Sequence, residues 1–366
     1  MPLLLWICTF ILIYSVSNAA RETPYSDYRE AFIDSSMGSW QDPLSSQNAL
    51  CTEGLAQYHE GHYSKAMDLF KAAAEDGLPE AQHNLGLMYS SGIGVEKDDR
   101  KAAAWYRKAA EQGLPISQFE LGSLYYSGQG VSQDFKKAFA WCMKAAENGF
   151  STAFFTLGNL YMNGVGVQQD DANAIKWFTA AARSGDVQAQ LQLANMYASG
   201  TGVMQDYPEA IKWYSKAARK EDPMAQFNLG NLYAYGKGTP KNFELAAKWF
   251  SLAAEGGNPQ AQHNMGYFCN KGIAMPKDPS RAAYWFTLAA EQGYPPSQAS
   301  LGIMYRDGLG VEKSLETAYM FLRIASNNDY PAAQALLDKL IGQMTDKEIS
   351  RGESLAREWL EADRLY

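Results

Sequence analysis

The chain has 366 residues, of which 46% are hydrophobic and 13% aromatic, a composition typical of a packed protein rather than a disordered one. It contains 32 Lys and Arg against 40 Asp and Glu, so the formal net charge is −8, and these charges are dispersed along the chain. Because there is no basic stripe, nucleic acid is not an expected partner.

The chain opens with a short apolar segment. LLLWICTFILIY runs from Leu3 to Tyr14, and the small residues Ser17 and Ala19 follow where a signal peptidase requires them. A membrane-spanning helix needs about 20 apolar residues, more than this segment supplies. We therefore expect a signal peptide at residues 1–19 and no stable membrane insertion after its cleavage. Since no Lys or Arg precedes the apolar segment, an uncleaved anchor stays open as the alternative.

A signal peptide implies an exported protein. The chain has no N-x-[ST] sequon, which favours a bacterial origin and hence the periplasm or the medium. For a eukaryote, the ER lumen or the extracellular space is the corresponding expectation. Residues 20–47 show no periodicity and contain Pro, Ser, Gly and charges throughout, so we expect a flexible leader.

Residues 48–80 predict a first pair of helices. Small residues suited to a close helix crossing, Gly54 and Ala66, lie 12 positions apart in this segment. In the segment that follows, the corresponding residues Gly86 and Ala102 lie 16 positions apart. The first pair of helices is therefore expected to have a shorter connecting loop.

Residues 81–332 repeat with a period of 36 residues, seven times and without an insertion. The rows begin at Ala81, Ser117, Ala153, Ala189, Ala225, Ala261 and Ser297. Each row predicts two helices. In the first row Pro79 suits the first helical position, Gly92 ends the first helix, and Asp98 is the expected N-cap of the second.

The loop between these helices, YSSGIGVEKD, contains a G-x-G pattern that in a single copy would suggest a ligand site. Related loops recur in all seven rows, so we interpret them as connections between helices. In the fourth row Ala194 stands where the first row has Gly86, which suggests that this position requires a small residue rather than glycine itself. Ala274 replaces the second loop glycine in the sixth row, which predicts that this position is less demanding.

The pattern LGxxYxxGxGVxxDxxKAxxWYxKAAExG resembles Sel1-like repeats, relatives of the tetratricopeptide repeat. The resemblance implies an all-α fold, a right-handed α-solenoid of helix-turn-helix repeats. Residues 48–80 look like a tetratricopeptide unit and are expected to cap the N-terminal end of seven Sel1-like repeats. Residues 333–366, with a capping box at Thr345 and Glu348, are expected to form C-terminal capping helices, which such stacks require.

No catalytic, cofactor or metal site is expected. The four histidines, His59, His62, His83 and His263, do not form a ligand set with suitable spacing. A cysteine-rich branch of the Sel1-like family has paired cysteines within each repeat, and β-lactamase activity has been proposed for it. This chain lacks the pairing, and we expect Cys142 and Cys269 to be buried as small hydrophobic residues. A cell-wall or β-lactam hydrolase is therefore only the alternative to a non-catalytic protein.

Function is expected on the first helix of each repeat, which lines the concave face in tetratricopeptide-like superhelices. Asn159, Asn195 and Asn231 occupy one position in consecutive rows and could bind an extended peptide backbone. Adjoining positions carry Phe119, Phe155, Phe227, Tyr126 and Tyr235, which could hold its side chains. Alternatively, the asparagines are tolerated near a helix end and the phenylalanines pack between repeats. The function class that follows is a monomeric protein-interaction scaffold that binds a peptide segment or a partner domain.

Overall fold

The computed structural model describes residues 46–362, so the predicted signal peptide and residues 20–45 of the predicted leader lie outside the described residues. Within this part, every regular element is an α-helix. The helices are α3 (Ser46–His59), α4 (Tyr63–Glu75), α5 (Pro79–Ser91), α6 (Asp99–Glu111), α7 (Pro115–Ser127), α8 (Phe135–Glu147), α9 (Thr152–Asn163), α10 (Asp171–Ser184), α11 (Val187–Ser199), α12 (Tyr207–Ala218), α13 (Pro223–Tyr235), α14 (Phe243–Glu255), α15 (Pro259–Lys271), α16 (Pro279–Glu291), α17 (Pro295–Asp307), α18 (Leu315–Asn327), α19 (Pro331–Ile341) and α20 (Asp346–Ala362).

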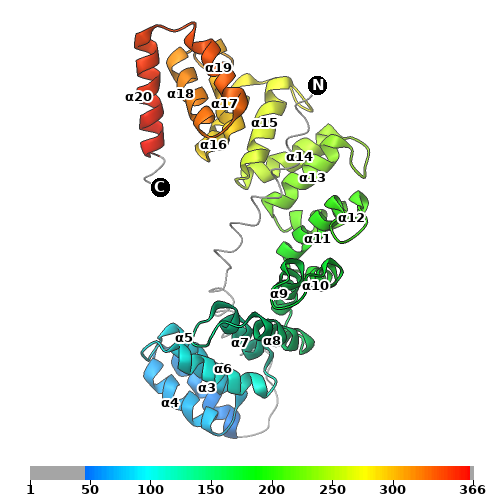
Figure 1. The fold of residues 1–366 in the computed structure, drawn as a ribbon, viewed down its shortest axis with the longest axis vertical. Helices are drawn as coiled ribbons and strands as arrows, with labels where there is room; N and C mark the ends of the chain where they lie inside the picture. Colours follow the sequence, from blue (N-terminus) through cyan, green and yellow to red (C-terminus); the bar gives the residue numbers. More distant parts are fainter. Residues whose placement is uncertain (1–45, 363–366) are drawn as a thin grey trace. The chain divides into compact units, whose positions relative to one another are not determined.

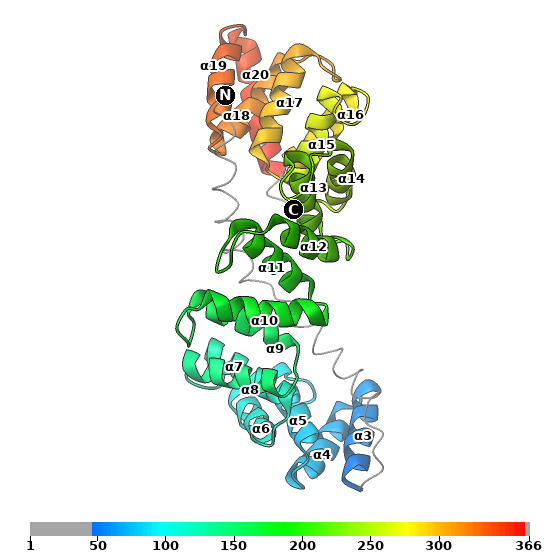
Figure 2. The same ribbon diagram turned by 90° about the vertical axis from the view of Figure 1, so that its right-hand side faces the viewer.

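The chain divides into two compact units, residues 1–148 and 149–366, which we call the N-terminal and the C-terminal unit. In the described part of each unit, successive helices pack on one another, except that α20 packs on α18 rather than on α19 (Figures 1 and 2). The N-terminal unit contains the pairs α3/α4, α5/α6 and α7/α8, and the C-terminal unit contains α9/α10 through α17/α18, followed by α19 and α20. The predicted all-α solenoid is confirmed.

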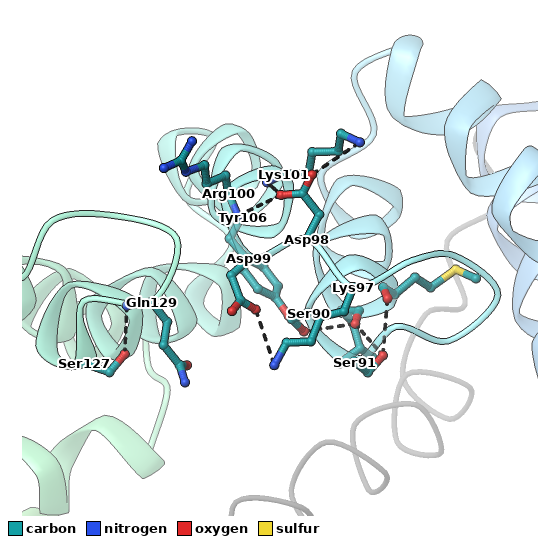
Figure 3. A network of polar contacts seen from close by, with 12 residues as sticks. Ser90, Ser91, Lys97, Asp98, Asp99, Arg100, Lys101, Tyr106, Ser127 and Gln129 are labelled. Atoms are coloured by element: carbon teal, nitrogen blue, oxygen red, sulfur yellow. Dashed lines mark hydrogen bonds and ion pairs between the residues drawn. The ribbon is translucent and has the colours of Figure 1, made fainter.

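Local sequence signals set the ends of the helices. Pro79 is the first residue of α5, and Gly92 ends it in the left-handed conformation with φ 73°. Asp98 caps α6, since its carboxylate accepts hydrogen bonds from the backbone N–H groups of Arg100 and Lys101 at 3.1 and 3.0 Å (Figure 3). The loop between these two helices is thus held by capping at both of its ends.

The two helices of a repeat cross closely because a residue without a side chain faces a ring. Gly86 on α5 lies against the buried ring of Tyr106 on α6, and a Cβ atom added to this glycine would be 2.6 Å from the ring. Gly158 and Gly230 meet Phe178 and Phe250 in the same way. In the fourth row, Ala194 is fully buried at this position, as the prediction of smallness requires.

The second glycine of each G-x-G loop connects one repeat to the previous one. A Cβ atom on Gly94 would lie 2.7 Å from the Cβ of Tyr63, the first residue of α4. Gly238 approaches the start of α12 in the same way, with the Cδ of Pro208 at 2.8 Å. Ala274 keeps the left-handed conformation, with φ 59°. The expectation that this position is undemanding was therefore wrong, because even the alanine that replaces the glycine adopts a conformation unfavourable for a side chain.

Buried glutamines supply a second connection between repeats. The Gln82 amide on α5 donates to the carbonyl of Ala74 at the end of α4, at 3.2 Å, and this carbonyl also accepts from the backbone N–H of Gly77 at 3.1 Å. The same bond recurs from Gln118, Gln190, Gln226, Gln262 and Gln298 to the carbonyls of Ala110, Ala182, Ala218, Ala254 and Ala290. In α9 this position is occupied by Phe154. Stacking is therefore both apolar and hydrogen-bonded.

Helix α20 covers the last repeat. Thr345 and Glu348 form the reciprocal capping box, with the backbone N–H of Thr345 donating to the Glu348 carboxylate at 2.7 Å. Trp359 then packs edge-on against Phe321 of α18, with ring centroids 5.2 Å apart. Leu355 and Leu360 join the same cluster. The apolar face of α18 is thus shielded from water.

Gly238 and Gly257 have similar φ angles, but an added Cβ would meet other atoms only at Gly238. Replacing each by alanine therefore separates the free-energy cost of the backbone conformation from that of the steric clash. Gly238→Ala should lower the free energy of unfolding by about 3 kcal/mol, because it adds the left-handed strain to a collision with α12. Gly257→Ala, with φ +86° but nothing within 4 Å of the new Cβ, should cost only about 1 kcal/mol. Urea denaturation followed by circular dichroism measures both. Equal costs would show that the loop contact does not contribute to stacking.

Candidate functional site

The three predicted asparagines lie on successive first helices of the C-terminal unit. Asn159 is on α9, Asn195 on α11 and Asn231 on α13, and all three are partly buried. Each directly follows the small residue that faces the second helix, namely Gly158, Ala194 and Gly230. The structure therefore places them at equivalent positions in consecutive repeats, as the 36-residue period predicts.

Their hydrogen bonds differ, and the reason lies on the second helix. The Tyr214 hydroxyl on α12 donates to the Asn195 side-chain oxygen at 2.5 Å. In the repeats of Asn159 and Asn231, the residue equivalent to Tyr214 is a phenylalanine, which has no hydroxyl group. Within the described residues, the side-chain amides of these two asparagines make no hydrogen bond. Two of the three amides thus have no hydrogen-bond partner within residues 46–362, whereas Asn195 has a role inside its own repeat.

The aromatic candidates separate into two groups. Phe155 and Phe227 pack on the second-helix rings of Phe178 and Phe250, with centroids 5.6 and 5.9 Å apart. Phe119 and Phe227 are each only 8% exposed. These contacts agree with the alternative that the phenylalanines serve packing. The two predicted tyrosines, Tyr126 and Tyr235, differ because much of each side chain is exposed to solvent.

Tyr126 is 50% exposed and contacts Phe135 edge-on at 5.4 Å, and Tyr235 is 56% exposed at the end of α13. Tyr126 belongs to the N-terminal unit, whereas Tyr235 follows Asn231 by four positions on the same helix. One helical turn brings such residues onto one face. Of the two predicted tyrosines, Tyr235 is therefore the one that the structure places beside an unbonded asparagine.

Further amides lie on the same face and were not singled out from the sequence. Asn228 and Asn264, on α13 and α15, are partly buried, and no hydrogen bond of their side chains occurs within residues 46–362. Gln192 holds the equivalent position on α11, where its amide contacts the sulfur of Met162 at 3.3 Å. Their recurrence at 36-residue spacing was the signal available in the sequence.

Two histidines have serine partners in the next repeat. Nδ1 of His83 lies 2.9 Å from Oγ of Ser117, and Nδ1 of His263 lies 2.9 Å from Oγ of Ser297. These serines begin the two rows that start with Ser instead of Ala, and each row follows one that contains a histidine. Burial lowers the pKa of His263 to about 4, so its ring is neutral at pH 7. Both pairs serve stacking between repeats.

The cysteines lie in apolar surroundings, as predicted for Cys142 and Cys269. Cys51, Cys142 and Cys269 are all buried and free. Burial raises the pKa of the Cys142 thiol to about 12, and burial with the nearby Glu80 raises that of Cys51 to about 12. Both therefore remain protonated thiols at neutral pH rather than nucleophilic thiolates.

Residues 46–362 contain neither a candidate metal site nor a helix that could span a membrane. No group of three or more His, Cys, Asp and Glu side chains in this range could hold a metal ion. His62 lies 3.2 Å from the carboxylate of Glu60 and accepts or donates a bond with Gln57, so its ring has local partners. None of the helices in this range has the length and apolar character needed to cross a membrane.

The repeat geometry agrees with the comparisons with known proteins. The Sel1 repeat model matches residues 49–78, 79–114, 115–150, 155–186, 187–222, 223–258, 259–294 and 295–330. The chain therefore belongs to the Sel1 repeat family. Its first match, 49–78, is the segment interpreted as a tetratricopeptide-like unit, so the model counts eight repeats where the 36-residue register counts seven.

Solved structures show the same fold. A Sel1 repeat protein from Oxalobacter formigenes is 30% identical with a TM-score of 0.66, and the match covers 87% of this chain and 92% of that one. The protein c5321, a protective antigen of uropathogenic Escherichia coli strains with an SLR fold, is 30% identical with a TM-score of 0.57, covering 86% and 84%. None of the curated proteins compared with the chain matches it.

The His263–Ser297 pair predicts a pH dependence of stability. Below about pH 6.5 the unfolded chain binds a proton that the folded state does not take up until about pH 4, so stability is full above pH 6.5 and falls as the pH decreases toward 4. The expected loss is about 2 kcal/mol, since the ring keeps some solvent exposure.

A double variant, His263→Phe/Ser297→Ala, tests this dependence, because it recreates the Phe227–Ala261 combination of the preceding repeats. Urea denaturation at pH 7.5 and pH 4.5 should show a smaller loss of stability in the variant than in the wild type. The carboxylates titrate in both proteins and cancel in the comparison. An identical loss in both proteins would exclude His263 as the source.

Proposed function

We propose that this protein is a non-catalytic interaction scaffold whose first helices in the C-terminal unit bind a peptide segment or a partner domain. Sel1 and tetratricopeptide-like repeat proteins typically mediate protein interactions, and the family supports this class of function. The observation that carries the proposal is the pair of unbonded amides of Asn159 and Asn231, at equivalent positions and without partners inside the described part. Amide groups both donate and accept, so each can form two bonds to a backbone.

The rigid backbone of the first helices beneath the asparagines supports the same proposal. The small residues Gly158 and Gly230, which precede Asn159 and Asn231, are fixed against the second-helix rings, so the backbone beneath each asparagine is held in place. A preorganised surface loses little conformational entropy on binding, which improves affinity without any additional contact. Asn195, held by Tyr214, is oriented most firmly of the three.

The matched test replaces the amides without exposing a new unpaired group. Asn159→Ala and Asn231→Ala are combined with Asn195→Ala and Tyr214→Phe, because Asn195→Ala alone would leave the buried Tyr214 hydroxyl unpaired. The variant should keep its circular dichroism spectrum. Its affinity for a partner identified by crosslinking in the native envelope or medium should fall by about tenfold to a hundredfold.

Two exposed glutamines in the loop between α9 and α10 provide the control. Gln168 and Gln169 replaced together by alanine remove the same kind of group from the same unit. This control should bind the partner as the wild type does. If the asparagine variant binds as tightly as the control, the proposal is rejected.

We further propose that the scaffold works outside the cytoplasm, on the basis of the apolar segment Leu3–Tyr14 and the small residues after it. Edman sequencing or mass spectrometry of the protein produced in its own organism should give Ala20 as the first residue. A protein that begins with Met1 would overturn cleavage and favour the uncleaved anchor. Loss of export after replacing Phe10 and Leu12 by arginine, which interrupts the apolar segment, would confirm that the segment acts as the signal.

A further inference from the structure

Charged residues are unevenly divided between the two helices of each repeat from α9/α10 to α15/α16. The first helices α9, α11 and α13 contain no Asp, Glu, Lys or Arg, and in α15 the single one is Lys271 at the C-terminal end. The second helices of the same repeats carry two or three each, for example Glu209, Lys212 and Lys216 in α12. In these four repeats the first helices therefore leave a nearly uncharged surface.

This uncharged surface is polar rather than hydrophobic. We define the amide strip as the six amide side chains that lie on one face of the four first helices α9, α11, α13 and α15. Its members are Asn159, Gln192, Asn195, Asn228, Asn231 and Asn264. The residues of one helix, such as Asn228 and Asn231, are three positions apart and so lie on one face. Two exposed rings, Tyr235 and Tyr267, lie along the same face at 56% and 46% exposure.

An ionised ligand would be poorly served by such a surface. A charged group that leaves water requires an opposite charge or a set of aligned hydrogen bonds in compensation. Along α9, α11 and α13 no side chain carries a charge, so neither an acidic nor a basic segment would find a counter-charge there. A neutral ligand avoids this cost.

A peptide backbone is the neutral ligand whose chemistry the strip matches. Every residue of an extended chain presents one N–H and one C=O, apart from proline. A primary amide side chain carries a carbonyl oxygen and an NH₂ group in one plane and can bond both. Because the strip repeats with the solenoid, it suits a polymer that repeats the same group along its length.

We propose that the amide strip binds an extended, uncharged polypeptide segment through its backbone, with Tyr235 and Tyr267 contacting its side chains. This inference rests on the proposed scaffold function and names the chemistry of the partner. Recognition of this kind is independent of ionic strength, and sequence selectivity comes mainly from exclusion of charged residues and from the two tyrosine contacts.

The test uses the mature chain, residues 20–366, and a phage library of random 12-residue peptides. Enriched peptides should contain fewer Asp, Glu, Lys and Arg than the input library. Synthetic copies should bind with a Kd that changes less than about twofold between 50 and 500 mM NaCl, because no ion pair is screened. N-methylation of alternate backbone nitrogens should weaken binding at least tenfold, because it removes the N–H donors.

Substitutions then locate the binding to the strip. Asn228→Ala/Asn264→Ala should weaken binding of the enriched peptides at least tenfold, whereas the loop control Gln168→Ala/Gln169→Ala should leave it unchanged. Asn228→Lys should shift a second selection toward peptides with Asp and Glu. Circular dichroism and urea midpoints establish that each variant is folded.

The outcomes separate this inference from the proposed function. Enrichment of charged peptides, or a strong salt dependence, overturns the neutral-backbone inference and leaves a binding scaffold in place. Binding unchanged by Asn228→Ala/Asn264→Ala also overturns it. If no peptide is enriched and a neutral hexasaccharide probe binds instead, the ligand class is wrong. If the partner captured in the native envelope also binds the asparagine variants unchanged, the scaffold surface itself is rejected.

Discussion

The close crossing of the two helices within a repeat is the constraint on which the rest of the structure depends. A ring such as that of Tyr106 lies directly over a residue such as Gly86, with no room for a Cβ atom between them. This contact fixes the rotation of the first helix about its own axis. Since position 86 and its equivalents face the second helix, the next position lies about 100° further round the first helix, and the amides are presented there. Packing and the candidate binding surface therefore have the same origin.

Connections between repeats are more varied than those within them. Loop glycines contact the start of the preceding second helix, and buried glutamines bond its end. Polar pairs are exchanged as units: where His263 replaces a phenylalanine, Ser297 replaces the alanine of the next repeat. Such paired exchange is expected where a buried polar group without its partner would cost free energy. Stability in a stack of this kind is a sum of nearest-neighbour terms, so each pair acts locally.

The unequal distribution of charged residues between first and second helices bears on what the first helices could bind. In the repeats from α9/α10 to α15/α16, the second helices carry nearly all the charged residues of the helices, and pairs such as Lys216 over Trp213 at 3.8 Å lie on them. The first helices of α9 to α13 carry none and instead expose amides and tyrosines. Because these helices offer no counter-charge, their surface suits a polar, neutral ligand better than a charged one.

The sequence by itself determined the repeat, the helix ends and the fold class, because periodicity, Pro79, Gly92 and Asp98 act through local geometry that needs no distant residue. It also placed Asn159, Asn195 and Asn231 in equivalent positions. Only the tertiary structure decided which of them is unbonded, because the answer depends on Tyr214 on one second helix and on Phe178 and Phe250 on two others. The tertiary structure likewise showed that Phe227 is buried in the packing between helices and that Tyr235 is exposed. It also showed that the backbone at Ala274 adopts the left-handed conformation. These properties arise from contacts between helices, and a single row of sequence does not contain them.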